Sequence, residues 1–271
     1  MRRAVDCAAV RRSTLPLLRC PRCRRGPLEA EGDTELLHFG PVRCAACGAV
    51  YPIAEGILDV TAGETRQRRS IAQWLMERPV VARAYERSVR PFFAELDAES
   101  EHVLLRAMLA PAPGEALLDL SCGSGFHAVR LAQDTPGLRV LGLDRSAPML
   151  HEATHHLTEA GAAVDLVRGE AADPPIADGA LDAVLNVASL HLYPDAAAVL
   201  RQVARMLRPG GRFVCATLLP ERLEPVNRLE ARAGVRRYDE DRLRALCAAA
   251  GLERFERVRL APWIVLRAVR T

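Results

Sequence analysis

The sequence ALLDLSCGSGFHA, residues 116–128, places a glycine-rich turn between a short apolar run and a helical pattern. The apolar run predicts a buried strand, and Gly123 and Gly125 in the turn allow a ligand to approach the backbone. Doubly wound sheets bind their ligands at the carboxyl ends of such strands. This stretch therefore predicts both a fold and the place of its ligand site.

Further apolar runs alternate with helical patterns after this turn. They predict an α/β fold over residues 111–271, a Rossmann-like, seven-stranded, doubly wound sheet. The expected strands are 116–120, 139–143, 164–167, 181–186, 211–217, 255–260 and 264–269.

Acidic residues at the strand ends favour S-adenosylmethionine over a dinucleotide as the ligand. Asp119 stands four residues before Gly123, close to the place expected for the methionine end. A carboxylate attracts the ammonium and sulfonium groups of S-adenosylmethionine and repels a pyrophosphate. Asp144 ends the second strand, where an acid can accept hydrogen bonds from both ribose hydroxyls. Ala128 replaces the third glycine of the dinucleotide fingerprint, a replacement that this fingerprint permits.

The remaining cofactor contacts are expected at the ends of the next strands. Met149 either lines the adenine face or packs its helix, and Glu170 ends the third strand, where its carboxylate can accept a bond from the adenine amino group. The predicted cofactor residues are Asp119, Ser121, Gly123, Gly125, Asp144, Arg145, Met149, Glu170, Ala171 and Asn186.

The loop after the fourth strand, residues 186–194, is expected beside the transferable methyl group. Its His191 is the candidate catalytic base, because an imidazole near its reference pKa of about 6.5 is partly neutral at working pH. The alternative is a histidine that only caps or packs the loop. Tyr85 and Tyr193 are candidates for orienting the substrate.

Four of the eight cysteines are spaced as metal ligands. Cys20 and Cys23 form one C-x-x-C knuckle, Cys44 and Cys47 form another, and 20 residues separate the two. Two such knuckles predict a closed tetrahedral shell of four sulfurs around one structural zinc ion, as in a zinc ribbon. A redox site would instead have a single C-x-x-C motif, placed at the start of a helix in a βαβ unit.

These patterns divide the chain into three predicted parts. Residues 1–63 form a zinc-ribbon module, 64–110 a helical bridge or lid, and 111–271 the α/β domain. The aromatic residues of the bridge either pack it onto the α/β domain or cover a substrate pocket. They are Trp74, Tyr85, Phe92 and Phe93.

Composition narrows the class of protein. The chain has 26% charged and 49% hydrophobic residues, which is typical of a globular protein and excludes a fibre. No apolar run approaches the roughly 20 residues that span a bilayer, and the N-terminus does not resemble a secretory signal, so a cytoplasmic location is expected.

All 37 basic residues are Arg, and residues 1–90 hold 16 of them against 10 acids. This basic front can meet phosphates, although a zinc ion held by four thiolates adds a charge of about −2 there. The sequence does not predict the oligomeric state.

The motifs DLSCGSG, LGLDRSAPML, LDAVLNVASLHLYPD and RMLRPGGRFV occur in this order, with Glu170 among them. As a set, over about residues 115–271, they resemble class I S-adenosylmethionine-dependent methyltransferases, the broad group that includes the ubiquinone and menaquinone C-methyltransferases. This resemblance implies methyl transfer to an O, N or C nucleophile of a small molecule.

A closer resemblance spans most of the chain. It is carried by ERPVVARAYER, SCGSGF, SLHLYPD and RRYDEDRLRALCAAAGLERF, and it is to uncharacterised plastid and cyanobacterial methyltransferases with a cysteine-rich front. That group usually has Asp at the position of Glu170.

Two alternatives stay open at this point. The 23S ribosomal RNA guanine-N1 methyltransferases resemble this chain in architecture, and the residues that would then contact RNA phosphates are Arg22, Arg24 and Arg25. Those enzymes tend to carry a Pro-Cys-type sequence where this chain has residues 189–191. A noncatalytic scaffold is the other alternative, and the intact cofactor motifs argue against it.

Overall fold

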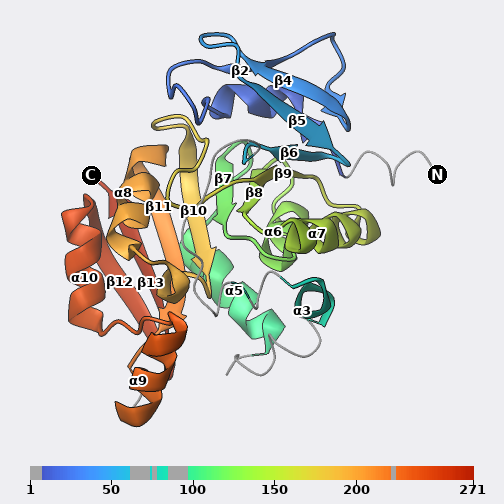
Figure 1. Ribbon diagram of the computed structural model, residues 1–271. Coiled ribbons are helices and arrows are strands. Elements are labelled where there is room, and N and C mark those ends of the chain that lie inside the picture. The colour runs from blue at the N-terminus through green and yellow to red at the C-terminus, as the bar shows by residue number, and fades with distance from the viewer. Residues whose placement is uncertain (1–7, 62–73, 75–77, 85–96, 221–223) are drawn as a thin grey trace.

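The computed structural model describes residues 8–61, 74, 78–84, 97–220 and 224–271. One long sheet runs through the molecule with helices on both faces, and the N-terminal segment lies at one end of that sheet (Figure 1). No helix among these residues combines the length and the apolar character needed to cross a bilayer.

Seven strands form the sheet predicted for the C-terminal part of the chain. They are β7 (Ala116–Leu120), β8 (Arg139–Asp144), β9 (Val164–Arg168), β10 (Leu181–Val187), β11 (Leu207–Leu218), β12 (Leu252–Leu260) and β13 (Trp263–Arg270). Their spatial order is β12-β13-β11-β10-β7-β8-β9, with β13 antiparallel to its two neighbours and the other pairs parallel. The predicted Rossmann-like, doubly wound α/β fold is confirmed.

The direction of the strand order reverses between β7 and β10. All five residues of β7 are buried, because this central strand is covered on both faces. Ligands of doubly wound sheets bind at such a reversal, outside the carboxyl ends of the strands.

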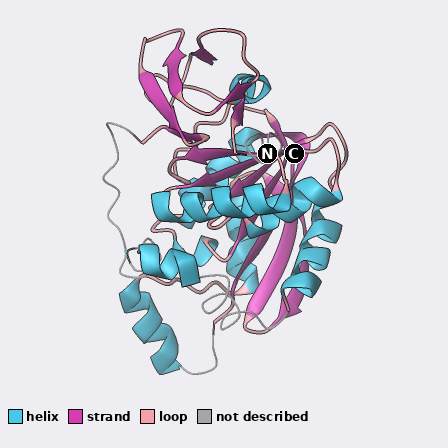
Figure 2. Cartoon of the chain, turned by 90° about the vertical axis from the view of Figure 1, so that its right-hand side faces the viewer, coloured by secondary structure: helices cyan, strands magenta, loops and turns pink. Residues whose placement is uncertain are grey.

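Helices cover the two faces of the sheet and bury separate apolar clusters. On one face lie α5 (Ala98–Leu109), α6 (Phe126–Asp134) and α7 (Ala147–Ala160), and on the other α8 (Ala196–Met206) and α10 (Glu240–Ala249). The side view shows the helices of one face stacked in front of the strands (Figure 2). Further helices in the described part of the chain are α3 (Pro79–Ala84), which lies against α7, the short η3 (Leu190–Leu192) and α9 (Glu224–Ala233).

The cysteine-rich front is a small β-rich unit that does not stand apart from the sheet. Its elements are β1 (Val10–Arg11), η1 (Arg12–Leu17), β2 (Leu28–Ala30), β3 (Leu36–Leu37), β4 (Gly40–Cys44), β5 (Val50–Ala54) and β6 (Ile57–Asp59). Strand β6 pairs in parallel with β9, so that β6, β5, β4 and β2 extend the seven strands to an eleven-stranded sheet. The prediction of seven strands missed the four that the front adds to the sheet. Strand β6 is only three residues long, and its pattern does not show which strand it pairs with. We refer below to residues 8–61 as the ribbon.

The bridge predicted at 64–110 is described only in part. Its described helices are α3 and α5, and Trp74 exposes 47% of its surface. Tyr85, Phe92 and Phe93 lie outside the described residues. The boundaries of the three predicted parts stay predictions.

Candidate active site

A cavity of about 380 Å³ opens at the carboxyl ends of β7, β8, β9 and β10, where the strand order reverses. Its walls come from the turns that follow these strands and from the first turns of α7 and α8. The predicted cofactor residues that line it are Ser121, Gly123, Asp144, Arg145, Met149, Glu170 and Ala171. The structure therefore gathers side chains from four strand ends into one concave site.

The glycine turn after β7 has the backbone shape that its sequence predicts. Gly123 and Gly125 have φ angles of +55° and +78°, a region that favours glycine. A Cβ on Gly125 would lie 3.1 Å from the Cβ of Ala153, so this glycine also lets α6 approach α7 closely. Gly123 lines the cavity, whereas Gly125 is not among the lining residues. At Gly123 the turn therefore presents backbone without a side chain to the cavity.

Asp144 is held at the cavity by backbone donors. The amide of Gly123 donates to its Oδ2 at 2.9 Å, and the amide of Ser146 donates to its Oδ1 at 2.8 Å. These bonds fix the carboxylate at the end of β8, at the place where a ribose was expected.

Asp119 is not among the residues that line the cavity, and it is 2% exposed. Burial and the nearby negative charge of Asp144 raise its pKa to about 7, against the opposing effect of a hydrogen bond with the backbone of Ala128. Two acids so placed favour a cation in the cavity, because a positive charge relieves their repulsion.

One ion pair crosses the side of the cavity where the adenine was expected. The guanidinium of Arg145 lies 3.4 Å from the carboxylate of Glu170, and both side chains are mostly buried. Asp195 adds a third acid to the wall, so the described lining holds three carboxylates and one guanidinium. The net negative charge fits the ammonium and sulfonium of S-adenosylmethionine and disfavours a phosphate-bearing ligand.

A chain of hydroxyl and amide groups stands at the opposite wall. The hydroxyl of Tyr193 lies 2.8 Å from Oγ of Ser121, and Nδ2 of Asn186 donates to the tyrosine hydroxyl at 2.8 Å. Burial raises the pKa of Tyr193 to about 12, so this phenol keeps its proton at neutral pH. Asn186 itself is 1% exposed and is not a lining residue, and it acts on the site by holding Tyr193.

His191 lies away from the cavity. Its Nδ1 is 3.3 Å from Oγ1 of Thr217, and its ring meets the indole of Trp263 edge-on at 5.8 Å between centroids. Burial lowers its pKa to about 4, helped by the charge of Arg237. Successive side chains of the 3₁₀ turn η3 point in different directions, so Leu192 reaches the cavity and His191 does not. His191 is not among the residues that line this cavity, and its role as catalytic base stays a prediction.

Several lining residues were not singled out from the sequence, although some of them belong to the loop 186–194 that was expected at the site. They include Ser146, Ser189, Leu192, Asp195 and Val199. Asp195 caps α8 by accepting a hydrogen bond from the amide of Ala198 at 2.9 Å. An acid directly before an apolar helical pattern is a helix-start signal, and it would have placed the first turn of α8 at this edge of the sheet.

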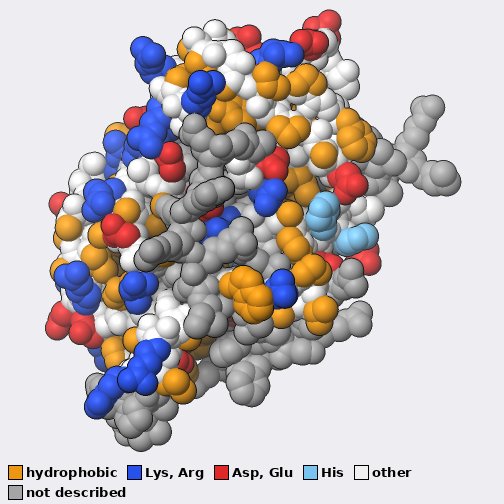
Figure 3. Space-filling view, viewed as in Figure 1, with side chains coloured by type: hydrophobic (Ala, Val, Ile, Leu, Met, Phe, Trp, Pro, Cys, Tyr) orange, Lys and Arg blue, Asp and Glu red, His pale blue; other side chains and the backbone are white. Residues whose placement is uncertain are grey.

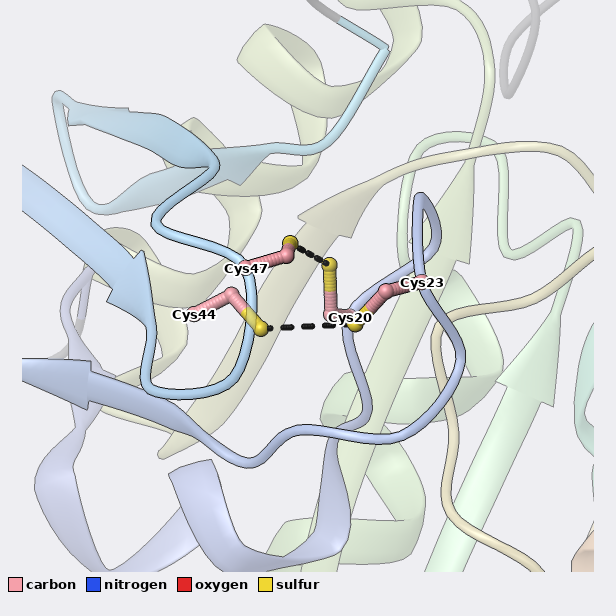
Figure 4. A group of neighbouring side chains, drawn as sticks. All are labelled: Cys20, Cys23, Cys44 and Cys47. Carbon is pink, nitrogen blue, oxygen red and sulfur yellow. Dashed lines mark hydrogen bonds between the residues drawn. The ribbon is translucent and has the colours of Figure 1, made fainter.

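The four predicted metal ligands come together in the ribbon (Figure 4). All four sulfurs lie within 4.8 Å of one another, with 3.7 Å between Cys20 and Cys47 and 3.6 Å between Cys23 and Cys44. A tetrahedral zinc ion with Zn–S bonds of about 2.3 Å needs sulfurs about 3.8 Å apart, so the arrangement fits.

The loops around these sulfurs support the same ligand set. Backbone N–H groups of Arg25 and Gly26 donate to the sulfur of Cys23 and lower its pKa to about 6. A Cβ on Gly26 would lie 2.5 Å from the sulfur of Cys44, so no larger residue fits there without movement. The first knuckle is thus shaped to present thiolates.

Comparisons with known proteins agree with this geometry. Residues 118–215 match a family described as a methyltransferase domain. An uncharacterised chloroplastic methyltransferase of Arabidopsis thaliana is 29% identical over 280 residues, covering 94% of this chain and 79% of that protein. A demethylmenaquinone methyltransferase of Corynebacterium kroppenstedtii is 37% identical over 116 residues, 42% of this chain and 47% of that protein.

Among solved structures, phosphoethanolamine N-methyltransferase 2 of Haemonchus contortus, in complex with phosphomonomethylethanolamine and S-adenosylhomocysteine, superposes with a TM-score of 0.63. The match has 15% identity and covers 76% of this chain and 60% of that chain, so it bears on the fold alone.

Proposed function

We propose that the chain is an S-adenosylmethionine-dependent methyltransferase of the class I fold and that it methylates a small organic molecule held in the cavity next to the cofactor. The observation that carries this proposal is the concave, net negative cavity of about 380 Å³ at the strand ends. Sites of this size take small molecules.

The described walls fit such an acceptor better than RNA. Beyond the cofactor residues, the cavity continues along apolar side chains of Val187, Leu192 and Val199, which suits an acceptor with an apolar body. On the face shown in Figure 3, arginines and acids are interspersed rather than gathered into one basic surface. The related demethylmenaquinone methyltransferase, by its name, also acts on a small molecule.

We assign the cofactor contacts to the residues that the cavity brings together. Asp144 accepts hydrogen bonds from the ribose, Glu170 and Met149 lie on the adenine side, and the backbone at Gly123 borders the methionine side. We propose that Asp119, buried near Asp144, ionises when the cationic cofactor binds, because a positive charge offsets the acid–acid repulsion that raises its pKa.

S-adenosylmethionine supplies a methyl group that is already attached to a good leaving group, the sulfonium sulfur. The work left to the protein is to orient the acceptor, which can lower a barrier by about 7–11 kcal/mol in favourable cases. We propose that Tyr193 does this through its hydroxyl, which Ser121 and Asn186 hold in place. Tyr85 is a second candidate, and it lies outside the described residues.

We further propose that the four cysteines hold one structural zinc ion. Four sulfurs close the shell and leave no position for water, so the ion would fix the ribbon and take no part in methyl transfer.

The test is a transfer assay with purified protein, methyl-labelled S-adenosylmethionine and lysate from a strain that lacks the gene. Label is partitioned among organic extract, RNA and protein. We expect it in the organic extract, and we expect Asp144→Asn to lower the rate about 10- to 100-fold, because hydrogen bonds to a charged group contribute about 1.5–3 kcal/mol each.

Glu159→Gln is the matched control, since it removes one exposed carboxylate from α7 away from the cavity. Label in RNA would contradict the small-molecule proposal. Cofactor binding without label in any fraction would support a noncatalytic scaffold instead.

A further inference from the structure

The ribbon is joined to the segment that forms one wall of the cavity. That segment, residues 169–178, follows β9, and its first residues Gly169, Glu170 and Ala171 line the cavity. Strand β6 pairs with β9 up to the pair Asp59 and Arg168, immediately before this segment. The ribbon therefore fixes the point from which the wall begins.

A second connection holds the far end of the same segment. The amide of Arg19 donates to the carbonyl of Pro175 at 3.0 Å, and the amide of Ala177 donates to the carbonyl of Leu17 at 2.8 Å. Between these bonds, Leu18 pairs with Ile176 in an isolated β-bridge, and both side chains are buried. This connection lies directly before Cys20 in the chain.

The first cysteine knuckle itself makes the third connection. The guanidinium of Arg24, between Cys23 and Gly26, lies 2.8 Å from the carboxylate of Asp173. The amide of Asp173 in turn donates to the carbonyl of Glu170 at 3.1 Å. One short path thus leads from the metal-binding loop to the wall that faces the cofactor.

We propose that the metal-bound ribbon positions residues 169–172 for the nucleoside end of the cofactor, so that metal binding and cofactor binding strengthen each other. Arg24 is a positioning residue in this scheme. The inference rests on the cofactor and zinc assignments proposed above, and it adds that the two sites are energetically coupled.

The physical reason is that the ribbon supplies many of the partners of β9 and of the wall, next to those that Arg205 of α8 supplies at Pro174 and Ile176. Without the metal, the knuckle at residues 20–23 loses its cross-link to the knuckle at 44–47, and the segment 17–24 no longer has a fixed shape to pair with residues 173–178. A wall that is free to move must be ordered when the ligand binds, and this weakens binding.

The first experiment measures binding of S-adenosylhomocysteine by calorimetry to the full-length protein, loaded with zinc and after removal of the metal by a chelator. We expect the dissociation constant to rise about tenfold on metal removal, within the usual range of coupling between two sites. Linkage requires the reciprocal effect, so saturating S-adenosylhomocysteine must tighten zinc binding by the same factor in a competition with a coloured chelator. Equal constants with and without the metal would overturn the proposal.

Hydrogen exchange separates local loosening from general unfolding. On metal removal we expect exchange of amides in residues 169–178 to speed up more than that of amides in β7 and β8. Uniform loss of protection in all strands would mean that the metal only keeps the protein folded, which also overturns the proposal.

A point variant tests the path without removing the metal. Arg24→Ala should weaken S-adenosylhomocysteine binding about two- to fivefold, the range expected for loss of one exposed ion pair, and Arg24→Lys should restore it. Arg43→Ala is the matched control, because Arg43 is similarly exposed in the ribbon but pairs with Glu31, away from the wall. Equal effects of the two alanine variants would contradict the assigned path.

These measurements also separate a failure of the cofactor assignment from a failure of the proposed coupling. If zinc-loaded protein does not bind S-adenosylhomocysteine at all, the cofactor assignment fails. If it binds with an unchanged constant in every metal and Arg24 state, the cofactor assignment stands and the coupling fails.

Discussion

Asp119 is buried close enough to Asp144 for the charge of Asp144 to raise its pKa. Its pKa of about 7 lies above the usual value of about 4 for an aspartate in an unfolded chain, because burial and the second acid oppose its charge. The folded protein therefore keeps a proton that the unfolded chain releases between these two values. The resulting stabilisation is full below about pH 4 and is lost as the pH rises through about 7.

We predict that the melting temperature of the cofactor-free protein decreases between pH 5 and pH 8 and that Asp119→Asn removes most of this decrease. The asparagine side chain does not ionise, so this position has no proton to release and no longer makes the stability depend on pH. Thermal melts by circular dichroism in a series of buffers test this. Glu159→Gln should keep the wild-type slope, and an unchanged slope in Asp119→Asn would show that the carboxyl is ionised throughout.

The second residue-scale prediction concerns His191. Its pKa of about 4 and its place beside Thr217 leave it neutral and away from the cavity at pH 7. We expect His191→Gln to change kcat less than about fivefold, whereas Tyr193→Phe lowers it about 10-fold or more through loss of a hydrogen bond at the site. Rates with each variant between pH 5 and pH 8 check this, and a loss above 100-fold with His191→Gln would restore the general-base hypothesis.

At the scale of single elements, the start of the ribbon closes over an acid in the middle of β9. Asp165 is 2% exposed and accepts hydrogen bonds from the amide of Arg11 at 2.7 Å and from the hydroxyl of Thr14 at 2.6 Å. Its pKa is raised, chiefly by burial. A buried carboxyl that needs partners from another element is a sensitive point of the fold.

We predict that Thr14→Val destabilises the protein by about 1–3 kcal/mol, the cost of leaving a buried acceptor without one partner. The neighbouring Ser13→Ala is a close control, because the Ser13 hydroxyl bonds Glu35 at the exposed surface and should contribute less than about 0.5 kcal/mol. Urea unfolding of the two variants gives both values. Equal losses would mean that Asp165 does not depend on Thr14.

On the scale of the whole molecule, the ribbon and the methyltransferase strands share one sheet and one apolar cluster. Buried ribbon residues such as Val10, Leu18 and Leu58 belong to the same cluster as Val199 of α8 and Leu243 of α10. Without β6, strand β9 would become an open edge with unpaired backbone groups, which promotes association.

We therefore expect metal removal to lower the melting temperature of the whole described sheet rather than to unfold the ribbon alone. Scanning calorimetry of zinc-loaded and chelator-treated protein should give one transition in each case, displaced downward after chelation. Metal analysis should give one zinc ion per chain, lost in Cys23→Ser and kept in Cys247→Ala, because Cys247 is buried in α10 away from the cluster. Two separate transitions, with the upper one unaffected by the chelator, would show that the two parts unfold independently.

The sequence alone determined the features that depend on short stretches of chain. The turn at Gly123 and Gly125, the acid at the end of β8 and the four-cysteine spacing were all predicted, because local backbone geometry and ligand chemistry require those residue types at those spacings. Only the tertiary structure decided where His191 points and that β6 joins β9. Both depend on contacts between residues far apart in the chain. The direction of one side chain in a 3₁₀ turn and the partner of a three-residue strand leave almost no periodic signal, and packing against distant elements selects them.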